Sequence, residues 1–96
     1  AGGIVDVIRI LKENINDLDV SLMVEYAVQM QSSVLIQRFG YLLDQLDVSY
    51  DDQFMLSYSR QTLYYLDPYY SCGIKPHRNE KWNLMINVPD SLFNKK

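Results

Sequence analysis

The apolar residues of segment 34–47 repeat with the 3.6-residue period of an α-helix. They stand at i, i+4, i+7, i+8 and i+11 and form one stripe: Leu35, Phe39, Leu42, Leu43 and Leu46. A serine at position 32 or 33 can cap the first turn of such a helix. We therefore predict a helix over residues 34–47, on whose stripe the rest of the chain packs.

Gly40 lies in the middle of this predicted helix, where glycine costs about 1 kcal/mol relative to alanine. A glycine in a helix interior usually marks a place where another part of the chain comes close to the backbone. We expect a second helix to pack against Gly40.

Similar spacing predicts a helix over residues 4–13 and another that begins after an Asp19 cap. The positions expected to face the core are Ile4, Val7, Ile8, Leu11 and Ile15 in the first of these, and Val20, Met23, Ala27 and Met30 in the second. The two methionines also fit an adaptable partner surface, although filling the core is the commoner role. Residues 49–52 resemble a capping box and predict a fourth helix to about Ser59, with an aromatic face of Tyr50, Phe54 and Tyr58.

The period changes to two in the C-terminal part of the chain. Residues 62–66 are β-branched and aromatic, and residues 82–88 alternate strictly, with Trp82, Leu84, Ile86 and Val88 on one face. Asp90 can cap a last turn that docks Leu92 and Phe93. We predict that the two strands pair antiparallel across a long loop, residues 69–81. The predicted fold class is α+β, with about four helices followed by a C-terminal antiparallel β-ribbon with a long connecting loop.

Composition and charge narrow the function classes. A chain of 96 residues with 48% apolar content fits a single domain with a modest core. No apolar run approaches the ~20 residues of a membrane span, and Cys72 is the only cysteine, so we expect a cytoplasmic protein without a membrane partner. Residues 1–52 hold nine acidic and three basic residues, a net charge of −6, whereas residues 53–96 hold three acidic and six basic ones, a net charge of +3.

The basic half contains the candidate binding residues. Lys75, Arg78 and Lys81 cluster in the loop with only Glu80 nearby to neutralise them, and Arg60 precedes the first strand. Such cations suit a phosphate backbone or an acidic partner, although solvated surface is their commoner role. Four tyrosines adjoin the loop and can stack on bases or, more commonly, pack against helices: Tyr64, Tyr65, Tyr69 and Tyr70.

Catalytic and metal chemistry have little support in the sequence. Cys72 and His77 are two ligand types without a second pair to complete four-coordination, so we predict no metal site and no cofactor. The sequence also contains no Gly-rich phosphate loop and no nucleophile-elbow serine. We therefore expect that the chain is not an enzyme.

Three segments resemble the C-terminal domain of the AbiEi-type antitoxins, the transcription-regulating half of type IV abortive-infection toxin–antitoxin systems. Residues 36–44, IQRFGYLLD, are similar to the family's RLGYLLE helix, and Ala1-Gly2-Gly3-Ile4 resembles its yaGGI segment. Leu66-Asp67-Pro68, Gly73, Arg78-Asn79 and residues 81–88, KWNLMINV, resemble its closing LDP…G…N-rW-liiNV pattern. Phe39 and Lys81 depart from the leucine and arginine common in the family, and residues 48–61 have no counterpart in the pattern.

The resemblance implies that residues 1–96 are the C-terminal antitoxin domain of a longer prokaryotic transcriptional autoregulator, whose upstream winged-helix DNA-binding domain is absent here. The lack of an initiator methionine agrees with that expectation. The implied role is phage defence: the domain opposes a nucleotidyltransferase toxin without a stable complex and assists operator DNA binding through the full-length protein. The expected partners are the upstream domain, operator DNA and, weakly, a second copy. The alternative is an architectural module that docks on the absent N-terminal domain or self-associates.

Overall fold

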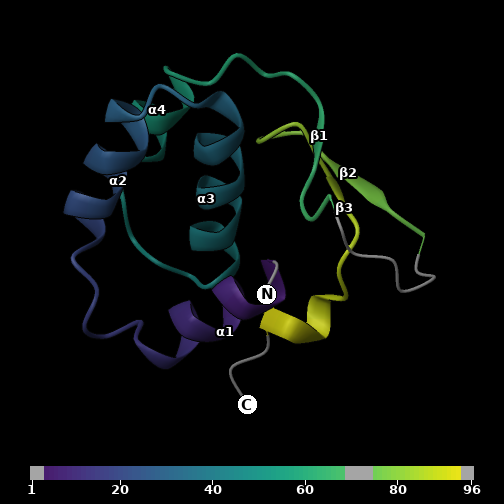
Figure 1. Cartoon of the computed structure of the whole chain (residues 1–96), viewed down its shortest axis with the longest axis horizontal. Helices are drawn as coiled ribbons and strands as arrows, with labels where there is room; N and C mark the ends of the chain where they lie inside the picture. The colour runs from purple at the N-terminus through teal and green to yellow at the C-terminus, as the bar shows by residue number, and fades with distance from the viewer. Residues whose placement is uncertain (1–3, 69–74, 94–96) are drawn as a thin grey trace.

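The computed structural model describes residues 4–68 and 75–93, and it has the α+β class that the sequence predicts. The described part begins with four α-helices, α1 (Ile4–Glu13), α2 (Val20–Gln29), α3 (Ser33–Gln45) and α4 (Asp52–Leu56). The strands β1 (Tyr64–Tyr65), β2 (His77–Asn79) and β3 (Leu84–Ile86) and the short 3-10 helix η1 (Asp90–Phe93) follow. In Figure 1, α3 stands between α2 and α4 on one side and the sheet on the other, with α1 and η1 below it.

Helix α3 is the centre of the fold, as predicted. The elements around it bury more of its surface than the single predicted apolar stripe. Ser32 caps it, because its hydroxyl oxygen accepts a hydrogen bond from the Leu35 backbone N–H at 3.3 Å. The buried residues are Ile36, Gln37, Gly40, Tyr41, Leu42 and Leu43 within the helix and Leu46 at its C-cap. Leu35 and Phe39 are only partly buried, since they lie at the edge of the contact with α2.

The sheet has the strand order β1-β3-β2, and this order corrects the predicted pairing. The first and last strands pair parallel, with Tyr64 opposite Leu84, so the predicted antiparallel pairing of these two strands is wrong. The antiparallel partner of β3 is β2, which lies within the segment predicted as loop. Asn79 explains this hairpin, because its Oδ1 accepts from the Trp82 N–H at 2.9 Å and closes a tight turn between the two strands.

The predicted inner face of the last strand is confirmed. Trp82, Leu84, Ile86 and Val88 are each at most 1% exposed, and they pack toward the helices. Gln37 of α3 is equally buried, and its Nε2 donates to the carbonyl oxygens of Thr62 and Trp82, both at 2.7 Å. The side chain of Gln37 thereby satisfies backbone acceptors just before β1 and β3, where the short strands supply no ladder bonds.

The positions on the shorter helices are predicted less well. Val7 of α1 is 43% exposed and Met30, which caps α2, is 67% exposed, so neither is a core residue. Helix α4 ends at Leu56 rather than near Ser59. Each of these helices contacts the rest of the fold along a narrow side, which leaves the margins of the predicted stripes in solvent.

The aromatic face predicted for the fourth helix is found in part, because two of its rings contact each other, but it is not the side that the helix buries. Met55 is the buried residue of α4, whereas Phe54 and Tyr58 are exposed and contact each other edge to face at 5.3 Å between ring centroids. The cap is Asp51 and not Ser49, since Asp51 Oδ1 accepts from the Phe54 N–H at 3.0 Å.

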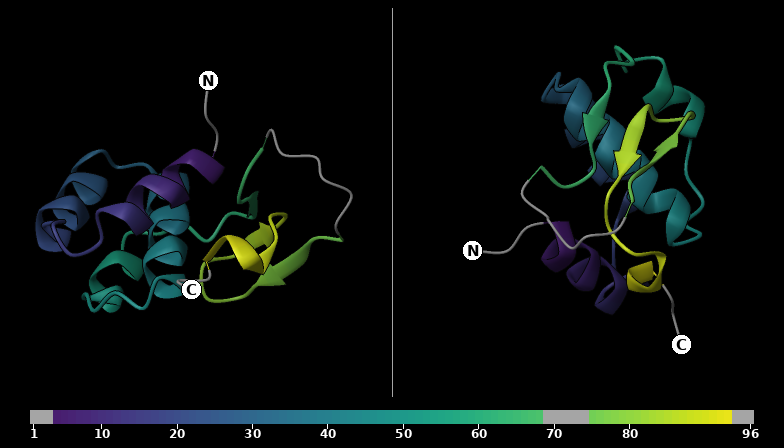
Figure 2. Two further views of the ribbon diagram at one scale, coloured as in Figure 1. Left: turned by 90° about the horizontal axis from the view of Figure 1, so that it is seen from below. Right: turned by 90° about the vertical axis from the view of Figure 1, so that its right-hand side faces the viewer.

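The ends of the described chain meet below α3. Figure 2 shows η1 beside α1, and Lys12 Nζ donates to the Leu92 carbonyl oxygen at 2.9 Å. Phe93 is buried and meets Tyr41 edge-on, with ring centroids 5.9 Å apart. The expected docking of this last turn is therefore confirmed.

Candidate functional site

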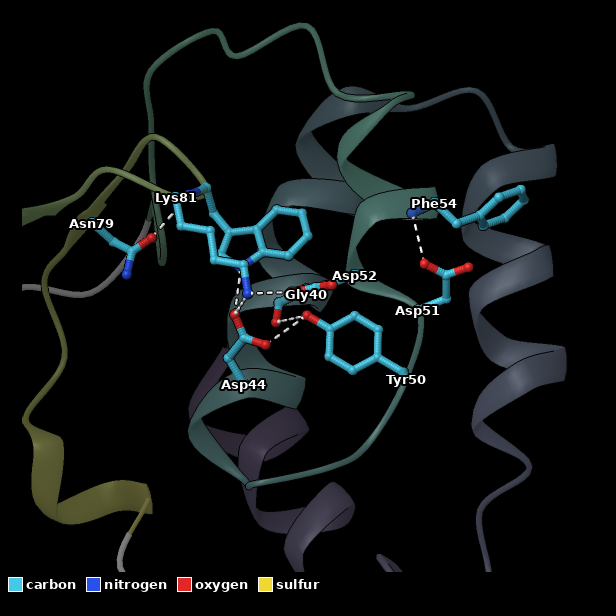
Figure 3. Close-up of polar contacts among 9 residues, drawn as sticks. Gly40, Asp44, Tyr50, Asp51, Asp52, Phe54, Asn79 and Lys81 are labelled. Atoms are coloured by element: carbon cyan, nitrogen blue, oxygen red, sulfur yellow. Dashed lines mark hydrogen bonds and ion pairs between the residues drawn. The ribbon is translucent and has the colours of Figure 1, made fainter.

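A cluster of charged and aromatic side chains joins the turn between β2 and β3 to the helices (Figure 3). Lys81 is its centre: Nζ lies 2.9 Å from Asp44 Oδ2 of α3 and 2.8 Å from Asp52 Oδ2 of α4. Its side chain is 38% exposed, so the pair of bridges lies at the rim of the core. From the sequence, only Glu80 was expected near this cation. The sequence around the loop does not show which carboxylates of distant helices come close to it.

Asp44 is the acceptor that connects the parts of the cluster. Besides Lys81, it receives the Trp82 Nε1–H on Oδ2 at 2.8 Å and the Tyr50 hydroxyl on Oδ1 at 2.7 Å. The Tyr50 oxygen also lies 3.0 Å from the Gly40 carbonyl oxygen. One carboxylate on α3 therefore holds the sheet and the segment that leads into α4.

Trp82 packs directly over Gly40. The two residues are so close that a Cβ at Gly40 would lie 2.4 Å from Cη2 and Cζ2 of the indole ring. The predicted close approach at Gly40 is thus confirmed, but a tryptophan next to the sheet makes it and not a second helix. Lys81 Nζ also lies 5.6 Å from the Trp82 ring centroid, within cation–π distance.

The charged groups of the cluster shift one another's pKa values. The hydrogen bond from Lys81 lowers the pKa of Asp52 despite some desolvation. Partial burial acts to lower the pKa of Lys81, but the hydrogen bonds and charges of Asp52 and Asp44 outweigh it and raise that pKa. The ion pairs of Lys81 with Asp44 and Asp52 thus link the turn between β2 and β3 to α3 and α4.

Tyr41, which is buried, and Tyr50, which is partly buried, make the stability of the fold sensitive to alkaline pH. Burial, the hydrogen bond to Asp44 and the nearby carboxylates raise the pKa of Tyr50, and burial together with Asp90 raises the pKa of Tyr41 to about 12. A raised folded-state pKa stabilises the fold fully below the unfolded value near ~10, and this contribution is lost as the pH rises toward the folded value.

We predict that the free energy of unfolding falls above about pH 10, where unfolded tyrosine ionises. In Tyr50→Phe this fall should be shallower, and at neutral pH the variant should be less stable by ~1–3 kcal/mol because Asp44 loses a donor. Urea unfolding followed by circular dichroism over a pH series measures both effects. An identical alkaline slope in the two proteins would contradict the prediction.

The predicted binding residues do not form one site. Lys75 and Arg78 are exposed at the edge strand β2, and Arg78 Nε donates to Asn83 Oδ1 at 3.0 Å. Arg60 is exposed between α4 and β1, and its backbone N–H donates to the Ser33 hydroxyl oxygen at 2.8 Å. Lys81 is held in the cluster, so the exposed basic edge of the described chain consists of Lys75 and Arg78 with His77 between them.

The sheet register brings together a surface that the sequence did not reveal. Tyr65 of β1 and Arg78 of β2 both stand opposite Met85 of β3, one on each side of it. Residues in register point to the same face of a sheet, and Tyr65 is 50% exposed there. An aromatic ring and a guanidinium thus share the outer face. Only the pairing order creates this surface, because Tyr65 and Arg78 lie on different strands and give no local motif.

The distance between Cys72 and His77 cannot be given, because Cys72 lies outside the described residues, as do Tyr69 and Tyr70. Among residues 4–68 and 75–93, no group of three or more His, Cys, Asp or Glu side chains is arranged to hold a metal ion. Within the same ranges, no helix has the length and apolar character needed to cross a membrane.

Comparison with models of protein families, with curated proteins and with solved structures found no match to this chain.

Proposed function

We propose that this chain is a non-catalytic antitoxin domain of a prokaryotic transcriptional autoregulator that counteracts a nucleotidyltransferase toxin. One observation carries the proposal: segments that resemble the AbiEi-type pattern, although far apart in sequence, contact one another. Gly40 and Asp44 of the RLGYLLE-like segment meet Trp82 of the closing segment. Asp67 and Asn87 pair through Asp67 N–H to Asn87 Oδ1 at 3.0 Å and Asn87 Nδ2 to the Asp67 carbonyl oxygen at 2.6 Å.

These contacts support the resemblance because they explain why a glycine, an acidic residue and a tryptophan occur together in the similar segments. The Trp82 ring can lie this close to the α3 backbone only because position 40 lacks a side chain, and its buried N–H needs an acceptor. Gly40 and Asp44 satisfy the two requirements at helical spacing i, i+4.

We further propose that the domain acts by binding and that its functional surface is the basic edge. Lys75 and Arg78 are exposed, and the outer sheet face beside them carries Tyr65. Cations next to an exposed aromatic ring suit a nucleic-acid backbone with its bases. The overall charge of −3 opposes DNA, so this edge acts as a second contact after an upstream DNA-binding domain has engaged the operator.

The test first asks whether a nucleotidyltransferase reading frame lies beside the parent gene. If it does, the full-length parent protein is produced together with that enzyme. The wild type should restore growth, and Lys75→Ala combined with Arg78→Ala should weaken operator binding and make its log–log salt slope shallower by roughly 1.8, for two lost phosphate contacts. Arg9→Ala, an exposed cation on α1, is the matched control and should leave the slope unchanged.

Two results would contradict the proposal separately. Failure of the wild type to restore growth would refute the antitoxin role. Restored growth and an unchanged salt slope in the double variant would show that the basic edge is solvated surface, and the binding face would then have to lie elsewhere.

A further inference from the structure

A hollow lies between α2 and the start of α4. Its volume is about 200 Å³, and it is lined by Ser21, Val24, Glu25, Tyr50, Asp51 and Phe54. That volume is below the ~300–1,000 Å³ of small-molecule sites, so the hollow has room for one side chain of another molecule. Val24 is buried and forms its apolar base. The rim carries both charged residues of the lining, Glu25 and Asp51, which are exposed.

The charge of the rim indicates which side chain fits. Glu25 comes from α2 and Asp51 from the cap of α4. Asp51 Oδ1 accepts from the Phe54 N–H at 3.0 Å, which leaves Oδ2 for a donor from outside. Figure 3 shows the Asp51 carboxylate on the side that faces α2, whereas Lys81 and the carboxylates that bind it lie nearer to the sheet. Among the described residues, the lining of the hollow thus has two acidic side chains and no cation.

The two aromatic rings of the hollow are held in place by the fold. The Tyr50 hydroxyl donates to Asp44 Oδ1 at 2.7 Å, and Phe54 contacts Tyr58 edge to face with ring centroids 5.3 Å apart. Phe54 is nevertheless 39% exposed. Side chains that are already fixed lose little entropy when a ligand binds, and the face of an aromatic ring attracts a cation. Carboxylates beside such rings have the chemistry that recognises an organic cation.

We propose that the α2–α4 hollow binds an arginine side chain presented by another protein. Arginine fits better than lysine, because its planar guanidinium can stack on the Phe54 ring while its N–H groups donate to Glu25 and Asp51. Its apolar stem then packs on Val24. The opposite charges also speed association of the partner. The inference is independent of the antitoxin proposal.

The three phenylalanines of the chain supply an internal control for a binding test. Phe54 lines the hollow, Phe39 lies between α2 and α3, and Phe93 is buried against Tyr41. With ¹³C-labelled phenylalanine, an acetylated glycine pentapeptide with one central arginine should shift the Phe54 ring signals and leave those of Phe39 and Phe93 in place. The same peptide with citrulline, which has the shape of arginine without its charge, should produce no shift at the same concentration.

A charge variant tests the same site. Glu25→Gln combined with Asp51→Asn removes both charges of the rim and keeps its shape. Asparagine caps a helix as well as aspartate does, so circular dichroism should show an intact fold. Affinity for the arginine peptide should fall about fivefold, as expected for the loss of two exposed ion pairs. Glu13→Gln combined with Asp17→Asn removes two exposed charges outside the hollow and should leave the affinity unchanged.

Several results would overturn the proposal. Equal Phe54 shifts with the arginine and citrulline peptides would exclude recognition of charge, and unchanged affinity in the Glu25 and Asp51 variant would exclude the hollow. An equal loss in both double variants would show that only net charge matters. Phe54 shifts that grow with protein concentration in the absence of peptide would show that a second copy occupies the hollow. Binding of free arginine as tight as that of the peptide would assign the site to the amino acid and not to a partner protein.

Discussion

Replacing Trp82 by alanine is expected to lower the free energy of unfolding by ~3–5 kcal/mol, the range for loss of a fully buried aromatic side chain. Trp82 is completely buried, and it joins the sheet to α3 through its contact with Gly40 and its hydrogen bond to Asp44. The loss combines buried apolar area, a cavity at the centre of the fold and the hydrogen bond from Nε1 to Asp44.

Guanidinium unfolding followed by far-ultraviolet circular dichroism measures this loss without relying on the fluorescence of the only tryptophan. Trp82→Phe is the matched control, because it keeps much of the apolar contact but lacks the Nε1 donor. Its loss should be intermediate. A loss below ~1 kcal/mol in Trp82→Ala would show that the sheet is held to α3 by other contacts.

Gly40→Ala should also destabilise the fold, although alanine is the better helix former by about 1 kcal/mol. The new methyl group would lie 2.4 Å from two ring atoms of Trp82, well inside van der Waals contact. Because the indole is fully enclosed, the clash must displace the sheet or α3. We expect a net loss of about 1–3 kcal/mol, the usual cost of overpacking a core.

The double variant separates this clash from a backbone effect. In the Trp82→Ala background the space above position 40 is empty, so Gly40→Ala should become neutral or stabilising by up to ~1 kcal/mol through helix propensity. The two substitutions would then be strongly non-additive. The same loss from Gly40→Ala in both backgrounds would mean that position 40 requires glycine for another reason.

The candidate site shows which contacts local sequence patterns predict and which they do not. Gly40 could be recognised as a close contact because a glycine in a helix interior is a local signal. Its partner, Trp82, could not be named, because the sequence does not state which element docks there. Lys81 was expected to have only Glu80 nearby, yet Asp44 and Asp52 pair with it from two helices. Ion pairs between residues that are far apart in sequence depend on distances in the folded protein, so sequence spacing does not predict them.

The sequence by itself determined the helices capped by Asp19 and Ser32, the central position of α3 and the buried face of β3. These features follow from side-chain periodicity and from capping hydroxyl or carboxylate groups, which act within a few residues. The tertiary structure alone decided the parallel pairing of β1 with β3, the insertion of β2 and the exposure of Met30. Each of these depends on which surfaces meet after the chain has folded back on itself, and the free energy of that choice is shared among contacts distant in sequence.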